Sequence, residues 1–197
     1  MVYPTRGSSQ SLSVSASYGR IRINSPEGGA RYPMAISYLK RETWLGASYR
    51  REDYFHLARM FTIGYNAEAT WTNLPEMGNE YIHRAFAPRF TPTAFSCTLF
   101  LPEFQEDSYI GGGVIPIFEL NEKLYLRTGI FVYKPDILKY KNFNDKLTYI
   151  TDVTAVFQTP IGPLSFSYNN FSVSSAKKNY WIFSFGYMIF NKRGVVY

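Results

Sequence analysis

Apolar and polar residues alternate along much of this chain, which is the pattern of β-strands whose two faces meet different surroundings. The clearest stretch runs from about residue 58 to 72, where Phe61, Ile63 and Tyr65 share one face and Thr62 lies on the other. No segment of convincing length repeats with the period of an α-helix. The alternation predicts eight strands, at about residues 11–24, 43–53, 58–72, 108–118, 123–133, 147–158, 164–169 and 178–190.

The segments between these strands are long and short in turn. Long ones cover about residues 25–42, 73–107 and 134–146, with a smaller one near Ser174, and short ones lie near Phe55, Asn121 and Ile161. Outer-membrane barrels have short turns at one end and longer loops at the other, whereas a soluble sandwich has no reason to separate loop lengths by end. The sequence therefore predicts one all-β domain over residues 1–197, an antiparallel transmembrane β-barrel of eight meander strands with a long loop at 73–107.

The two faces of the predicted strands differ in chemistry. One face is aromatic and aliphatic, as a surface in contact with lipid would be. Our candidates for this lipid-facing side are Phe61, Ile63, Tyr65, Phe166, Trp181, Phe183 and Phe185.

The other face carries mainly Ser, Thr, Asn and Gly, and it includes three charged residues that we place in the lumen: Glu68, Arg127 and Asp152. These charges could line a polar passage or anchor the long loop, or they could form an ion-pair network among themselves. We favour the ion-pair network, because buried charges generally need partners.

Composition narrows the functional classes. Of 197 residues, 46% are apolar, and 17 Tyr, 16 Phe and 3 Trp favour strands and a buried core. The net charge of +6 comes from scattered Lys and Arg rather than from a basic stripe, so we expect no nucleic-acid partner. A single cysteine, Cys97, excludes an internal disulfide, and His56 and His83 lie in no metal motif. We predict no cofactor, no metal site and no catalytic residue.

Several stretches together resemble known barrels. Residues 3–7, Tyr-Pro-Thr-Arg-Gly, resemble the Phe/Tyr-Pro-Thr-x-Gly turn of the bacterial surface antigen superfamily, the outer-membrane insertase barrels. Residues 159–164, Thr-Pro-Ile-Gly-Pro-Leu, resemble the turn before the last two strands of that superfamily. Residues 87–93, followed by 109–113 and 124–127, look like the C-terminal barrel of bacterial patatin-like phospholipases.

This resemblance implies the C-terminal half of a sixteen-stranded barrel in the outer membrane of a Gram-negative bacterium. Segment 73–107 would be the large loop that folds back into the lumen in this superfamily. That loop usually carries an Arg-Gly-aromatic or Arg-Ala type motif. Residues 102–107, Pro-Glu-Phe-Gln-Glu-Asp, have no arginine, so the usual loop contact is not carried over. The implied partners are outer-membrane lipid, the barrel-assembly machinery, and the remaining strands, supplied by upstream sequence or another chain.

A patatin-like hydrolase needs a Gly-x-Ser-x-Gly turn to expose its nucleophile, and the chain contains none. In the resembled proteins the hydrolase domain precedes the barrel, so we expect this chain to be no enzyme. Residues 1–7 have no basic region followed by an apolar core, so we expect no secretory signal there. Either further sequence lies upstream, or the barrel interpretation fails.

Three functional hypotheses remain open. The first is a half-barrel that anchors a larger protein or forms a passage. The second is a complete small eight-stranded outer-membrane barrel with a binding or structural role, since eight is the smallest count among such barrels. The third is a soluble all-β protein, either an enzyme or a lipid-binding barrel.

Overall fold

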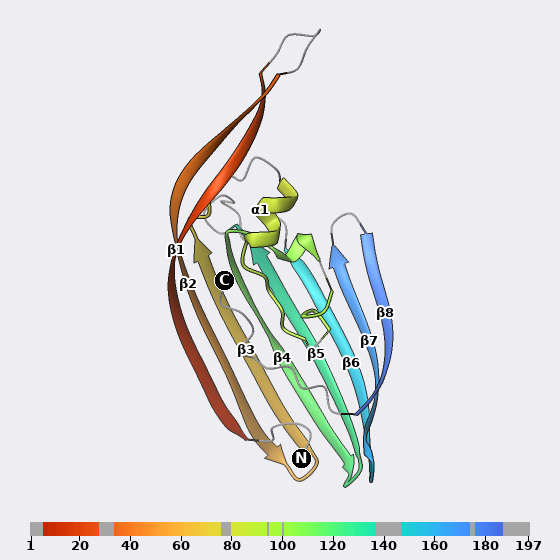
Figure 1. The fold of residues 1–197 in the computed structure, drawn as a ribbon. Coiled ribbons are helices and arrows are strands. Elements are labelled where there is room, and N and C mark those ends of the chain that lie inside the picture. Colours follow the sequence, from red (N-terminus) through yellow and green to blue (C-terminus); the bar gives the residue numbers. More distant parts are fainter. Residues whose placement is uncertain are drawn as a thin grey trace.

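The computed structural model describes residues 6–27, 34–75, 80–93, 95–99, 101–136, 147–173 and 176–186. Its eight strands form one antiparallel sheet in sequence order, each strand pairing with the next (Figure 1). This confirms the all-β meander. The strands are β1 (Gly7–Glu27), β2 (Met34–Ala58), β3 (Phe61–Thr72), β4 (Ser108–Asn121), β5 (Leu124–Pro135), β6 (Thr148–Thr159), β7 (Gly162–Val173) and β8 (Ala176–Phe185).

The sheet is open. β1 and β8 are its two edges, and no pairing joins them in the part of the chain that the structure describes. β1 and β8 run in opposite directions, because successive strands of a meander alternate in direction. Closure into a barrel is therefore not a feature of the described sheet.

The first hairpin is longer than the sequence predicts. The expected loop at 25–42 is wrong over most of its length, because β1 and β2 stay paired up to Glu27 and Met34. Pro26 lies within β1, which is an edge strand, where a missing N–H is tolerated. β2 meets β3 only from Gly46 onward, so the hairpin extends beyond the rest of the sheet (Figure 1).

The other strand ends lie close to the predicted ones. Short turns join β2 to β3, β4 to β5 and β6 to β7 at one end of the sheet, and the remaining connections lie at the other end (Figure 1). The predicted last strand ends at Phe185, and its expected continuation over 187–190 lies outside the described residues. None of the helices in the described part of the chain has the length and hydropathy to span a bilayer.

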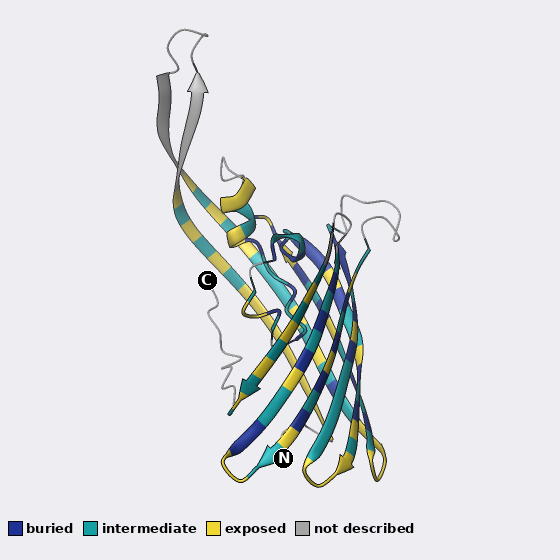
Figure 2. Ribbon diagram, turned by 90° about the vertical axis from the view of Figure 1, so that its right-hand side faces the viewer, coloured by how far each residue is buried: buried dark blue, intermediate teal, exposed yellow. Residues whose placement is uncertain are grey.

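The sheet is curved, and segment 73–107 lies on its concave face (Figure 1). This segment contains α1 (Glu80–Phe86) and the single 3₁₀ turn η1 (Pro102–Phe104). We call the opposite, convex side the outer face. Buried and exposed residues alternate along the strands as bands (Figure 2), as expected when successive side chains point to opposite faces.

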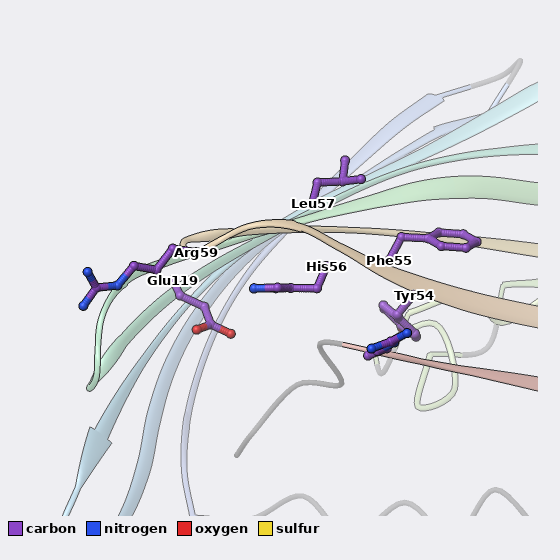
Figure 3. A pocket seen from close by; sticks show the side chains of 7 residues that line it. Tyr54, Phe55, His56, Leu57, Arg59 and Glu119 are labelled. Atoms are coloured by element: carbon purple, nitrogen blue, oxygen red, sulfur yellow. The ribbon is translucent and has the colours of Figure 1, made fainter.

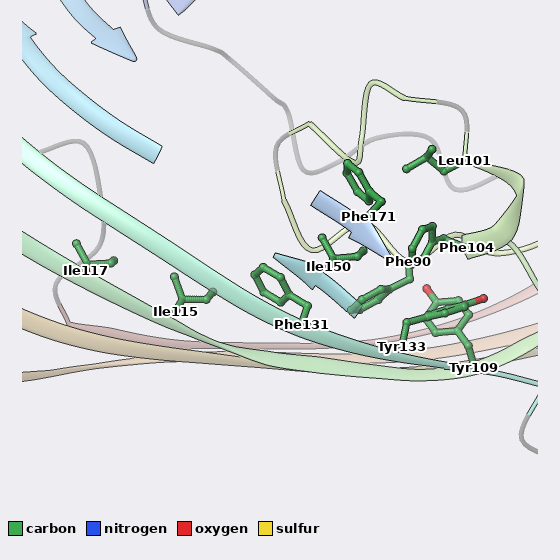
Figure 4. Close-up of a cluster of buried hydrophobic side chains, with 10 residues drawn as sticks. All are labelled: Phe90, Leu101, Phe104, Tyr109, Ile115, Ile117, Phe131, Tyr133, Ile150 and Phe171. Atoms are coloured by element: carbon green, nitrogen blue, oxygen red, sulfur yellow. The ribbon is translucent and has the colours of Figure 1, made fainter. Parts of the chain in front are cut away.

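A cluster of buried apolar side chains joins the segment to the concave face (Figure 4). Three members come from the segment: Phe90, Leu101 and Phe104. Seven come from β4 to β7: Tyr109, Ile115, Ile117, Phe131, Tyr133, Ile150 and Phe171. We call these ten residues the aromatic cluster. The expectation that the polar face is small and wettable is therefore wrong for this part of the sheet, where large side chains pack against the segment.

Candidate functional site

The concave face holds all three charged residues that we predicted for the lumen. Glu68 on β3 is buried and accepts hydrogen bonds from Arg50 on β2 and from the Tyr109 hydroxyl on β4. The Arg50 Nη2 atom lies 2.6 Å from Glu68 Oε2. Glu68 therefore ties three neighbouring strands together and places its charge beside the aromatic cluster.

Arg127 and Asp152 form a second ion pair on the same face, between β5 and β6. Asp152 is buried, and Arg127 is half-buried. Gly129 lies opposite Asp152 in the strand register, and a Cβ atom there would lie 2.2 Å from Asp152 Oδ1. A side chain at position 129 would therefore have to displace the Asp152 carboxylate and the Phe131 ring. The two ion pairs are separate, since Glu68 pairs with Arg50 and Arg127 pairs with Asp152. The second oxygen of Asp152, Oδ1, is buried without a hydrogen-bond partner among the described residues.

Segment 73–107 is also held by an ion pair that no sequence pattern indicated. Lys178 Nζ on β8 lies 2.9 Å from Glu103 Oε1 on η1. Burial alone would raise the pKa of the Glu103 carboxyl. The hydrogen bond from Lys178, a backbone hydrogen bond and the Lys178 charge outweigh burial and hold the pKa below its ordinary value. The segment thus contacts the concave face without an arginine, through an acidic residue of its own.

His83 on α1 connects the two ends of segment 73–107. Its Nδ1 atom lies 3.3 Å from the Pro75 carbonyl oxygen, and its Nε2 atom lies 3.1 Å from Asp107 Oδ2. The arginines of the segment bind within it, since Arg84 donates to the Pro102 carbonyl and Arg89 to the Leu99 carbonyl. The segment is therefore folded on itself before it meets the sheet.

Hydroxyl pairs bridge neighbouring strands on the concave face outside the aromatic cluster. Ser13 and Ser48 join β1 to β2, and Thr154 donates to Ser167 between β6 and β7. Ser165 and Ser184 form a third pair, between β7 and β8. These hydroxyl pairs are polar and uncharged, in contrast to the aromatic cluster.

The outer face carries the candidates that we assigned to lipid. Trp181, Phe183 and Phe185 on β8 are 64%, 69% and 55% exposed. Phe166 on β7 is exposed and stacks on Trp181. The remaining candidates, on β3, are half-exposed: Phe61, Ile63 and Tyr65. All seven therefore lie away from the aromatic cluster and away from segment 73–107.

One ion pair interrupts the apolar outer face. Arg51 Nε lies 2.7 Å from Asp53 Oδ2 on the same strand, and Asp53 is buried among its neighbours. Both residues alternate with concave-face residues such as Arg50, so they belong to the outer face. The two charges cancel, which lowers the cost of placing them in apolar surroundings.

A pocket of about 690 Å³ lies at the short-turn end of the sheet (Figure 3). Figure 3 shows His56 and the Glu119 carboxylate on the same side of the strands, with Leu57 pointing away from them. His56 Nδ1 is 3.2 Å from Thr62 Oγ1, so one ring nitrogen is already engaged. The lining residues are Arg6, Tyr54, Phe55, His56, Leu57, Arg59 and Glu119.

Other reactive residues form no site together. Among the described residues, no group of three or more His, Cys, Asp or Glu is placed to hold a metal ion. Cys97 is exposed and has no disulfide partner. No protein-family model, curated protein or solved structure matches this chain.

Proposed function

We propose that this chain is part of the wall of an outer-membrane β-barrel, with its outer face in lipid and its concave face toward a water-filled interior. It anchors a larger assembly in the membrane and lines a passage that segment 73–107 fills at one end. The exposed aromatic face of β7 and β8 carries this proposal. Soluble proteins rarely expose continuous apolar patches of more than a few hundred Å², and larger ones mark contact with a membrane or a partner.

The arrangement of polar groups supports the same orientation. Hydroxyl pairs and ion pairs line the concave face, whereas the outer face of the described strands carries a single ion pair, Arg51–Asp53. In a soluble barrel, the interior would be apolar and the exterior polar. In a soluble lipid-binding barrel, the third hypothesis, the exposed side chains of Trp181 and Phe183 would be in contact with water.

Segment 73–107 supports a barrel of more than eight strands. The interior of an eight-stranded barrel is just wide enough for its own side chains. Here the concave face also packs against a helix, a 3₁₀ turn and the aromatic cluster. Pairing of β1 with β8 would leave too little room inside for segment 73–107. A complete eight-stranded barrel, the second hypothesis, would therefore require this segment to leave the interior.

Both edges of the sheet then need partner strands. In hydrocarbon, every backbone N–H and C=O group must pair within the protein, so open edges are not tolerated. We propose that the sixteen-stranded barrel implied by the patatin-like resemblance supplies the missing strands, from upstream sequence or another chain. An in-frame Gly-x-Ser-x-Gly hydrolase domain encoded just before Met1 would support that family. Upstream sequence that encodes an unrelated soluble domain and no strands would contradict it.

Tryptophan fluorescence tests the orientation directly. The chain has three tryptophans, of which Trp71 and Trp181 lie exposed on the outer face. Trp44 instead packs against Leu74 and Ala87 of the segment and serves as the internal control. Three variants would each keep one tryptophan and replace the other two by phenylalanine.

After refolding into vesicles with brominated acyl chains, we expect quenching of Trp71 and Trp181 but not of Trp44. Equal quenching of all three would contradict the proposed orientation. A chain that stays in solution as a monomer without vesicles or detergent would contradict the membrane proposal itself.

A further inference from the structure

Two arginines face each other where the first hairpin leaves the sheet. Arg20 on β1 is the direct register partner of Arg41 on β2, and both side chains are exposed. Alternation along the strands puts Arg20 on the same face as Val14 and Tyr18, and Arg41 on the same face as Leu45. The pair therefore lies on the outer face.

This pairing is unfavourable for the hairpin alone. Side chains directly opposite each other in an antiparallel pair have Cβ atoms about 5 Å apart, and like charges there destabilise the pairing. No carboxylate in the described part of the chain forms an ion pair with Arg20 or Arg41. Glu42 is adjacent in sequence, but it alternates to the opposite face and has an interaction of its own. An anion between the two guanidinium groups would remove the repulsion.

The pair lies just beyond the apolar part of the outer face. Leu12, Val14 and Tyr18 of β1 are exposed in succession, and Arg20 is the next residue on that face. The pair also lies beyond Gly46, where β2 begins to pair with β3. Along this face, apolar residues are followed by a tyrosine and then by cations. The same order is found in membrane proteins across the boundary between hydrocarbon and lipid headgroups.

We propose that Arg20 and Arg41 together bind the phosphate groups of anionic lipids at the membrane surface on the side of the long connections. This inference rests on the proposed function, since it requires the outer face to lie in lipid. Guanidinium groups suit this role because their planar donors match phosphate oxygens in pairs. The site would fix the depth of β1 and β2 in the membrane at the point where the hairpin leaves it.

Vesicle flotation of the full refolded chain tests the inference. One set of vesicles contains phosphatidylcholine only, and the other contains phosphatidylcholine with phosphatidic acid, whose headgroup is a phosphate monoester. The test variant is Arg20→Gln/Arg41→Gln. The matched control, Arg59→Gln/Lys123→Gln, removes the same charge from exposed residues at the short-turn end.

We expect the unmodified chain and the control to prefer the phosphatidic acid vesicles by about 30-fold, from two basic residues at the surface. The test variant should bind both vesicles equally. Arg20→Lys/Arg41→Lys keeps the charge without the planar donors and should retain only part of the preference. Since the test substitutions relieve a repulsion, the variant should fold at least as well, which circular dichroism checks.

Equal binding of the unmodified chain to both vesicles would overturn this inference and leave the proposed function standing. An equal loss in the control would also overturn it, because general attraction by net charge would then explain the preference. Failure of the unmodified chain to bind either vesicle would overturn the proposed function and this inference together.

Discussion

Lys178 and Glu103 join the last strand of the sheet to the segment on its concave face, although 75 residues separate them in sequence. The aromatic cluster fixes the segment on β4 to β7, and this ion pair extends its attachment to β8. The segment is thus attached to β4 through β7 by apolar packing and to β8 by an ion pair. These two kinds of contact can be tested separately.

The Glu103–Lys178 contact should depend on pH. Because the folded pKa of Glu103 lies below its ordinary value of 4.5, its contribution is fully present above that value. The contribution is lost as the pH falls through the lower, folded pKa. We expect proteolysis within segment 73–107 to become faster over that acidic range, measured with an acid-active protease. Glu103→Gln should give fast cleavage at all pH values; an unchanged pH profile in this variant would contradict the assignment.

Phe104 should be the strongest single anchor of the segment. It is buried and contacts the rings of Tyr133 and Phe171, with centroids 5.2 and 6.0 Å away. Phe104→Ala should cost about 3–5 kcal/mol of the free energy that holds the segment in place. Hydrogen exchange of the segment measures this cost. Phe86→Ala on α1 is the control, because Phe86 is exposed and should change little.

Gly111 makes room for Phe90. A Cβ atom at position 111 would lie 2.3 Å from the Phe90 ring, which must then move. Gly111→Ala should destabilise the docked segment by about 1–3 kcal/mol through overpacking. Phe90→Ala removes the ring, so the added cost of Gly111→Ala should disappear in the double variant. An additive double-mutant cycle would show that the two residues do not compete for space.

The Arg51–Asp53 pair should matter for membrane insertion. Asp53→Ala leaves Arg51 unpaired on the outer face, where an unpaired arginine in contact with lipid is destabilising. Folding titrations in vesicles should show a lower free energy of unfolding for this variant. Arg51→Ala/Asp53→Ala removes both charges and should recover most of the stability. A double variant as impaired as Asp53→Ala would mean that these residues act through something other than their charges.

Local pattern was enough to predict the strands and their faces. Alternation depends only on the period of two, so it was enough to expect Phe183 and Asp152 on opposite faces of the sheet, where the structure places them. The turns near Asn121 and Ile161 were also predictable, because Asn and Gly favour tight turns. The extent of β1 and β2 was missed, because Pro26 and the glycines after it suggested a loop.

The packing of segment 73–107 could not be read from the sequence. Its prolines and irregular pattern contain no period, and α1 has only seven residues. Phe90 and Phe104 are held by rings that come from distant strands, so no local signal marks them as core residues. Lys178 and Glu103 likewise become partners only when the meander brings β8 beside the segment.

The unequal lengths of the edge strands have a consequence for access. β1 has 21 residues and β8 has 10. Strands that completed a barrel would therefore pair with a long edge strand at β1 and with a short one at β8. From Met34 to Leu45, β2 runs through about 40 Å of strand before it reaches β3. In the membrane barrel proposed above, an antibody or phage that approached from the side of the long connections would contact this hairpin before the other strand ends.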